Sequence, residues 1–274
     1  MKWTPGGRSP NLEDRRSSSG MGRGLGIGGT VVVLALSLLF RRNLFQDLGV
    51  QPGVATSAPM SAADSAAQEP EVQFISTLLD DVQGTWAKTL PAAGTPFHPA
   101  KLVLFRNSTE SGCGPAKSAM GPFYCPLDER VYLDLGFFDE LKQRFGASGD
   151  FAQAYVVAHE LGHHVQHLLG TDARARQQEA SNPGAANEVS VHLELQADCY
   201  AGVWGHSAEQ RGKLEAGDMD EALNAASAVG DDRIQSRTTG QVNVDSFTHG
   251  SAAQRSAAFK RGFESGDPRT CNSV

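Results

Sequence analysis

The sequence has no excess of positive charge and no closely paired cysteines. Lys and Arg together number 24 against 31 Asp and Glu, which gives a net charge of −7. A nucleic-acid partner and a basic membrane-binding surface are therefore not expected. The four cysteines form no C-x-x-C pair, so neither a zinc ribbon nor a redox motif is indicated. There is no internal repeat, and 40% hydrophobic residues over 274 positions indicate an ordinary globular domain.

The cysteines are instead placed to form two disulfides. Cys113 and Cys125 flank a turn region rich in glycine and proline. Cys271 lies near the C-terminus, where a bond to Cys199 would hold the end of the chain. The alternative is four free thiols in a reducing cytosol. The choice between these two interpretations depends on whether the chain is exported.

An uncharged segment near the N-terminus bears on export. Residues 24–40 carry no charge and their second half is strongly apolar, although this run is shorter than the ~20 residues that a spanning helix prefers. Five basic residues precede the segment and two follow it, a distribution that predicts a cytoplasmic N-terminus. We expect an uncleaved transmembrane helix at 24–42, with the remainder of the chain outside the cytoplasm. A cleaved signal peptide is the alternative, but Arg41 and Arg42 directly after the run argue against it.

The rest of the chain divides by composition and periodicity. We expect residues 1–23 to form a cytoplasmic segment, 43–70 a flexible linker, and 71–274 the folded domain. Apolar spacing and turn signals predict the helices and strands of that domain. The expected helices cover 74–86, 151–169, 187–204, 220–229 and 251–259, and the expected strands cover 101–106 and 130–135.

The predicted helix at 151–169 contains the motif H-E-x-x-H. His159 and His163 are four residues apart, so both imidazoles project from one face of the helix and can reach a single ion, with Glu160 between them. Neutral imidazole suits zinc, and a catalytic zinc takes a third protein ligand while keeping a position for water. The residue six positions after His163 is Leu169, which excludes the three-histidine pattern of metzincins.

Glu194 is the best candidate for the third ligand. It lies in the next predicted helix, where its carboxylate would complete a His/His/Glu set around one zinc ion. Asp198 lies one turn further along, where it could accept the outer N–H group of a ligand histidine. The alternative is that Glu194 and Asp198 form a solvated helix face. His164 and His167 are expected at the surface or behind the ligands.

These motifs resemble those of the bacterial putative neutral zinc metallopeptidase family, whose members are membrane-anchored at the N-terminus. The resemblance is carried by residues 159–166 (HELGHHVQ) and 194–204 (ELQADCYAGVW), and extends to 11–16, 111–114, 121–126, 131–134, 246–250 and the tail around Cys271. It implies zinc on two histidines and a glutamate in a gluzincin-like fold. We therefore expect an α+β protein with a mainly helical zincin-like core, a small antiparallel sheet and an N-terminal transmembrane helix. The expected location is a bacterial cell membrane, crossed once, with the domain periplasmic or extracellular.

The predicted activity is hydrolysis of peptide bonds by a membrane-tethered endopeptidase whose polypeptide substrate is unidentified. Zinc-activated water would attack, with Glu160 as the general base. His249, in the loop before the last predicted helix, is the candidate donor to the oxyanion, and Tyr155 and Tyr200 are weaker ones. Strand 131–135 is either an edge that binds extended substrate or an interior strand. The competing hypothesis is a non-catalytic envelope protein that keeps zinc for folding, but the retained Glu160 favours an enzyme.

Overall fold

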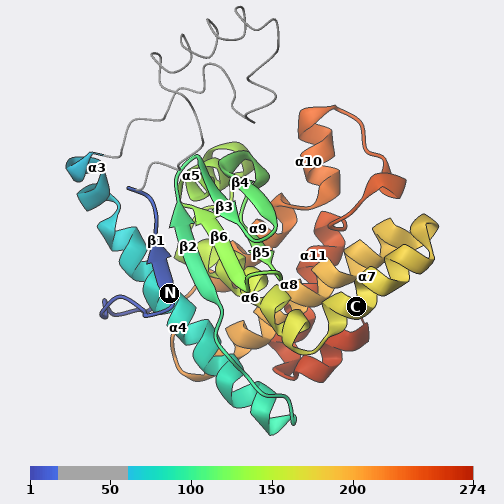
Figure 1. Cartoon of the computed structure of the whole chain (residues 1–274), viewed down its shortest axis with the longest axis horizontal. Helices are drawn as coiled ribbons and strands as arrows, with labels where there is room; N and C mark the ends of the chain where they lie inside the picture. The colour runs from blue at the N-terminus through green and yellow to red at the C-terminus, as the bar shows by residue number, and fades with distance from the viewer. Residues whose placement is uncertain (18–60, 274) are drawn as a thin grey trace, which may run out of the picture.

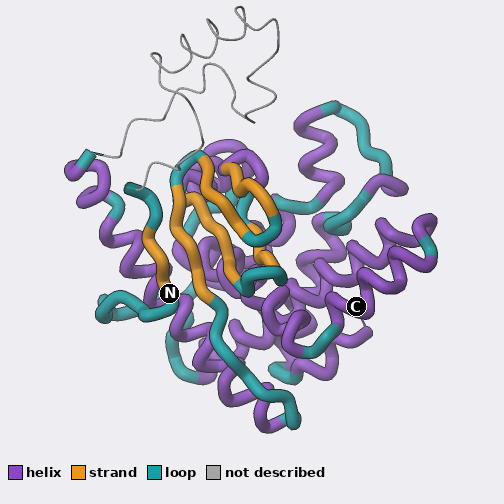
Figure 2. Tube along the Cα trace, in the orientation of Figure 1, coloured by secondary structure: helices purple, strands orange, loops and turns teal. Residues whose placement is uncertain are grey.

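A computed structural model describes residues 1–17 and 61–273 of the chain (Figure 1). Helices make up most of this part and surround a small sheet (Figure 2). The helices are α3 (Ala62–Ala67), α4 (Glu69–Ala92), α5 (Gly136–Phe145), α6 (Asp150–Leu168), α7 (Thr171–Ser181), α8 (Ala186–Gln210), α9 (Asp218–Ala228), α10 (Asp231–Thr238) and α11 (Ala252–Ser265). The strands are β1 (Leu12–Asp14), β2 (Lys101–Phe105), β3 (Ser108–Ser111), β4 (Gly114–Lys117), β5 (Phe123–Cys125) and β6 (Arg130–Asp134).

The main sheet has four strands in the order β1-β2-β6-β5. β1, β2 and β6 run parallel, and β5 pairs antiparallel with β6. The predicted small antiparallel sheet is therefore wrong, because the sheet is mixed; β3 and β4 form a separate antiparallel hairpin. β6 runs parallel to β2 because the connection between these two strands is long and passes through the hairpin and β5. This connection returns the chain to the end of the sheet where β2 starts, so that Lys101 pairs with Arg130.

Both faces of the sheet are covered. On one face, Leu102 of β2 and Val131 of β6 belong to the main hydrophobic core together with residues of α4 and α6. On the other face, Phe105 and Tyr132 pack with Ala116 of the β3–β4 hairpin. Successive side chains of a strand point to opposite faces, so a strand covered on both faces is apolar throughout. This explains the continuous apolar run from which β2 was predicted.

The helices below the sheet pack in the order α6, α8, α11. α8 and α11 approach closely at Gly262, where an added Cβ would lie 1.9 Å from the carbonyl oxygen of Cys199. α11 begins with the predicted capping box, in which the Ser251 hydroxyl accepts from the Gln254 N–H and the Gln254 side chain accepts from the Ser251 N–H. The predicted helix at 187–204 is longer than expected, because α8 continues to Gln210.

The N-terminal residues belong to the same fold. β1 lies beside β2, with Leu12 opposite Leu102. The ammonium group of Met1 lies 2.5 Å from Asp150 Oδ1, at the start of α6. Residues 1–17 are thus part of the folded domain and not a separate cytoplasmic segment.

This pairing also corrects the predicted membrane arrangement. The expected span at 24–42 and most of the expected linker at 43–70 lie outside the described residues, although 62–67 form α3 and α4 begins at Glu69. Within the two described ranges, no helix is both long and apolar enough to cross a membrane, so the fold as described contains no transmembrane helix. Because β1 is hydrogen-bonded to β2, the N-terminus and the domain lie on the same side of any membrane. The prediction of a single-pass protein with these parts on opposite sides is therefore wrong.

Candidate metal centre

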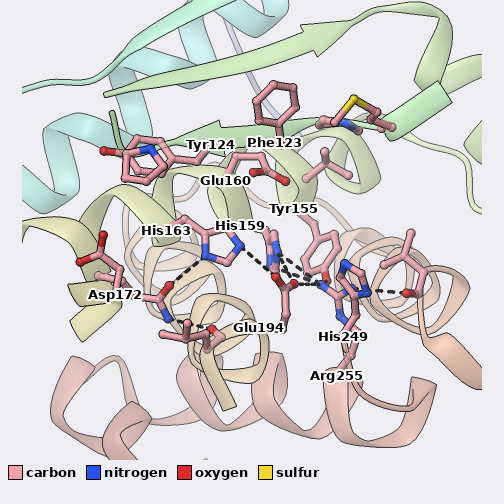
Figure 3. Close-up of a pocket in the computed structure, with 18 of the residues that line it drawn as sticks. Phe123, Tyr124, Tyr155, His159, Glu160, His163, Asp172, Glu194, His249 and Arg255 are labelled. Atoms are coloured by element: carbon pink, nitrogen blue, oxygen red, sulfur yellow. Dashed lines mark hydrogen bonds and ion pairs between the residues drawn. The ribbon is translucent and has the colours of Figure 1, made fainter. Parts of the chain in front are cut away.

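Three side chains from α6 and α8 meet at the bottom of a cleft (Figure 3). His159 Nε2 lies 3.2 Å from Glu194 Oε2, and His163 Nε2 lies 3.4 Å from Glu194 Oε1. One ligand atom from each residue lies within 4.8 Å of the other two. Two ligands at ~2 Å from a tetrahedral zinc are about 3.3 Å apart, so the spacing of these donors fits a single ion. The three residues expected from the sequence to act as ligands are therefore neighbours in the fold.

Each histidine is oriented by a hydrogen bond at its other ring nitrogen. His159 Nδ1 lies 2.8 Å from Asp198 Oδ1, and His163 Nδ1 lies 2.8 Å from Gln166 Oε1. Because a carboxylate or amide oxygen only accepts, each Nδ1 carries a proton, and each Nε2, which faces Glu194, is the nitrogen left to bind a metal in place of a proton. This is the tautomer that binds a metal through Nε2. Donor types, spacing and tautomers all fit zinc.

Asp198 is itself held in a buried network. Arg255 donates from Nε to Asp198 Oδ2 at 2.8 Å and from Nη2 to Asp198 Oδ1 at 3.0 Å, and the Tyr155 hydroxyl donates to Oδ1 at 2.5 Å. None of these three residues is more than 3% exposed. Removing one member of a buried charge pair leaves the other unpaired at high cost, so the network holds Asp198, and with it His159, in one position.

The charges around the cluster favour a cation at its centre. Burial would raise the pKa of Glu194, but the two facing histidines hold it well below its ordinary value. Burial likewise lowers the pKa of His159, but Asp198 outweighs this effect and raises it to about 10. The position between the three donors is therefore one where positive charge is stabilised.

Glu160 faces the same cleft from α6 (Figure 3). The residue is 7% exposed, and burial raises the pKa of its carboxyl. A raised pKa suits a carboxylate that must take up a proton near neutral pH. The cleft has a volume of about 500 Å³. We call α6, α8 and α11, which lie on this side of it, the helical floor.

The opposite side of the cleft is formed by residues 120–126, which include β5 and which we call the sheet wall. The Tyr124 hydroxyl joins the wall to the floor through a 2.9 Å hydrogen bond with His164 Nδ1. β5 is an outer strand of the sheet, while β6 lies between β5 and β2. The suggestion of an edge at 131–135 is therefore wrong, and the edge beside the site is β5.

His249 lies at the rim of the cleft, on the loop before α11 (Figure 3). Asp231 fixes this loop, because its Oδ2 accepts the backbone N–H groups of residues 248–250 and its Oδ1 lies 3.3 Å from His249 Nδ1. The hydrogen bond to Asp231 raises the pKa of His249. Of the two weaker candidates, Tyr155 donates to Asp198, and Tyr200 is buried away from the cleft lining.

The cysteine pairs considered from the sequence are both disulfides, Cys113–Cys125 and Cys199–Cys271. The first ties β5 to the β3–β4 hairpin. The second ties α8, at the residue after Asp198, to the C-terminal residues. Each disulfide therefore tethers one side of the cleft.

Two residues of the site had no expected role. Gln166 follows His163 by three residues, a spacing that places both on one helix face, so the signal was present in the sequence. Its Nε2 also donates to the Leu193 carbonyl oxygen on α8 at 2.7 Å. Asp231 lies in α10, and only the tertiary fold brings it to His249. No local pattern could have indicated that contact.

One protein family and several individual proteins match this chain over most or all of its length. The family described as putative neutral zinc metallopeptidase covers residues 1–274. The uncharacterized protein YpfJ of Escherichia coli (strain K12) is 47% identical over 281 residues, which span 99% of this chain and 98% of that protein. The uncharacterized protein Rv2575 of Mycobacterium tuberculosis (strain ATCC 25618 / H37Rv) is 43% identical over 251 residues, which span 82% of this chain and 83% of that protein. No solved structure matches the chain.

Proposed function

The chain belongs to the putative neutral zinc metallopeptidase family, and we propose that it is an endopeptidase with one zinc ion at the centre formed by His159, His163 and Glu194. One observation carries this proposal: two imidazole Nε2 atoms and a carboxylate converge within bonding reach of one ion, beside the buried Glu160. A zinc site used only for folding is closed by four protein ligands, whereas this set of three leaves a position for water.

The proposed chemistry divides between the ion and the chain. Zinc, when bound, makes a water molecule acidic near neutral pH and polarises the scissile carbonyl. Glu160 takes the proton of the attacking water and then delivers it to the leaving amine. Its raised pKa supports both steps, because the carboxyl can hold the proton between them. Asp198 and Gln166 keep the two histidines in the orientation that this chemistry needs.

His249 is the proposed donor to the negative charge that develops on the carbonyl oxygen. It lines the cleft and is fixed by Asp231 through both its backbone and its side chain. Because Asp231 raises its pKa, His249 is more often the charged imidazolium, which stabilises an oxyanion more strongly than a neutral donor does.

The proposed substrate is a polypeptide bound in an extended conformation along β5. Within the described part of the sheet, the outer edge of β5 has no partner strand, so its main-chain groups can pair with a substrate segment. Phe123, Phe137 and Val156 line the cleft and supply apolar contacts for its side chains. The acidic net charge of −7 gives no support to a nucleic-acid substrate.

The decisive experiment compares the wild-type protein with Glu160→Gln. Both are expected to bind zinc at the centre, but the variant should cleave an unfolded protein at least ~10²-fold more slowly, because it lacks the base. Glu179→Gln, a change to a half-buried carboxylate on α7 that does not line the cleft, is the matched control and should leave cleavage unchanged. Equal cleavage by wild type and Glu160→Gln would refute the mechanism.

The ligand assignment has its own test. Glu194→Ala should lose the ion bound at the centre, because two histidines alone hold zinc weakly. Full retention of that ion would refute the assignment of Glu194. Zinc bound in the wild type with no hydrolysis of any peptide would instead support a non-catalytic binding protein.

A further inference from the structure

A second group of histidines and a carboxylate lies where α6 meets the loop before β2 and the turn between β5 and β6. Its members are His98, Glu129, His164 and His167. Three segments that are distant in the sequence supply them. The proposed hydrolysis uses none of these side chains.

The Glu129 carboxylate lies between two of the imidazoles. Its Oε2 is 2.5 Å from His98 Nε2, and its Oε1 is 3.9 Å from His167 Nε2. One ligand atom each from His98, Glu129 and His164 lies within 4.8 Å of the other two. The donor types are the same as at the proposed catalytic centre, imidazole nitrogen and carboxylate oxygen.

His167 is oriented as a metal ligand. Its Nδ1 lies 2.8 Å from Asp172 Oδ2, and Asp172 also accepts from Arg176. A carboxylate only accepts, so Nδ1 carries the proton and Nε2 presents its lone pair toward Glu129. A carboxylate behind a histidine in this way is the common support for a metal-bound imidazole.

His164 is buried, and both of its ring nitrogens already make hydrogen bonds, one to His98 and one to Tyr124. Its Nε2 lies 2.8 Å from the His98 carbonyl oxygen, and its Nδ1 bonds the Tyr124 hydroxyl. A tyrosine hydroxyl can either donate or accept, so His164 can move its proton to Nδ1 and keep the Tyr124 bond. Its Nε2 can then bind an ion once the His98 carbonyl oxygen, which now lies 2.8 Å away, moves aside, and the bond given up is worth only about 1 kcal/mol.

Among the ion pairs of residues 1–17 and 61–273, those of Glu129 are made with His98 and His167. A divalent cation at this position would be attracted by the carboxylate and would bind imidazole nitrogens at the same time.

We propose that this cluster is a second zinc site. Its ligands are His98, Glu129, His164 and His167. Four protein ligands fill the coordination of zinc and leave no position for water, so the site is structural in type. It clamps the loop before β2 and the β5–β6 turn onto α6, and it does so beside Tyr124, the residue that joins the sheet wall to the floor.

Metal counting on the full chain tests this proposal separately from the proposed function. Metal-stripped protein is dialysed against Zn²⁺, and bound zinc is measured per chain. The wild type should bind two ions, the double variant with His98→Ala and Glu129→Gln one, and Glu194→Ala also one. The triple variant should bind none. His192→Ala, which removes an exposed histidine of α8, should still bind two.

The Glu194→Ala variant isolates the second site. Loaded with Co²⁺, it should give the intense visible absorption of a four-coordinate ion, and adding Glu129→Gln should abolish that absorption. A wild type that binds a single zinc, or a second ion that survives in the double variant, would overturn the proposal. Far-UV circular dichroism confirms that the variants are folded, so a lost ion is not a lost fold.

Discussion

The two sides of the cleft are held in different ways. The helical floor is fixed by close helix packing and by buried charges, such as the pairing of Arg255 with Asp198. The sheet wall is fixed by one disulfide, one hydrogen bond from Tyr124 and the pairing of β5 with β6. Damage to the floor should therefore affect the metal and the chemistry, whereas damage to the wall should affect substrate binding.

The largest effect is expected where the floor is packed most tightly. In Gly262→Ala, the new Cβ would lie 1.9 Å from the Cys199 carbonyl oxygen and 3.0 Å from the Val203 nitrogen. The backbone atoms of α8 cannot rotate out of the way as a side chain can. We therefore expect α11 to move and to carry Arg255 away from Asp198. We expect a loss of about 3 kcal/mol in the free energy of unfolding, measured by denaturant titration, together with weaker zinc retention.

Gly84→Ala is the matched control for this change. Gly84 is exposed in the interior of α4, and an added Cβ there would meet nothing within 4 Å. The substitution should stabilise the protein by about 0.5–1 kcal/mol, because alanine loses less backbone entropy in a helix. Similar losses from both substitutions would mean that the α8–α11 contact is not specially tight.

The floor and the wall also differ in how far the sequence predicts them. α6 and α8 are long, and their key residues are four positions apart, His159 and His163 on α6 and Glu194 and Asp198 on α8, so local patterns were sufficient. β1 and β5 have only three residues each, and the partner of β1 lies in a distant part of the chain. The membrane prediction failed for the same reason. Hydropathy and charge bias are local, whereas the pairing of Leu12 with Leu102 is not.

The second-largest effect is expected from removing the disulfide of the sheet wall. Replacing Cys113 by Ser and Cys125 by Ala opens a loop with a sequence separation of 12. Loop entropy predicts a loss of about 2–3 kcal/mol in the free energy of unfolding. We expect KM for a peptide substrate to rise more than kcat falls, because β5 then lies less firmly beside the floor. Weaker binding of the zinc held by His159, His163 and Glu194 in this variant would contradict the separation of the two sides.

A smaller effect is expected from removing one hydrogen bond of the helical floor. Gln166→Met keeps the volume of the side chain but removes the acceptor of His163 Nδ1. The affinity for zinc should fall about tenfold, at the lower end of the range for groups that orient a metal ligand. Competition with a chelator measures the change. Gln178→Met, an exposed change on α7, should leave the affinity as it is, and an unchanged affinity in Gln166→Met would show that His163 needs no support.

The smallest effect is expected at the rim, where floor and wall face each other across the cleft. Asp231 raises the pKa of His249 through its hydrogen bond, so the protonated form is present below that raised value and is lost as the pH rises through it. If the proposed oxyanion donor is the imidazolium, kcat/KM must fall on the alkaline side. Asp231→Asn keeps an oxygen acceptor for the backbone N–H groups of 248–250 but removes the charge, so the alkaline fall should move to lower pH.

Asp245→Asn, on the same exposed loop, should leave the profile in place. An alkaline limb that stays fixed in Asp231→Asn would remove His249 from the mechanism and leave the floor alone to stabilise the oxyanion.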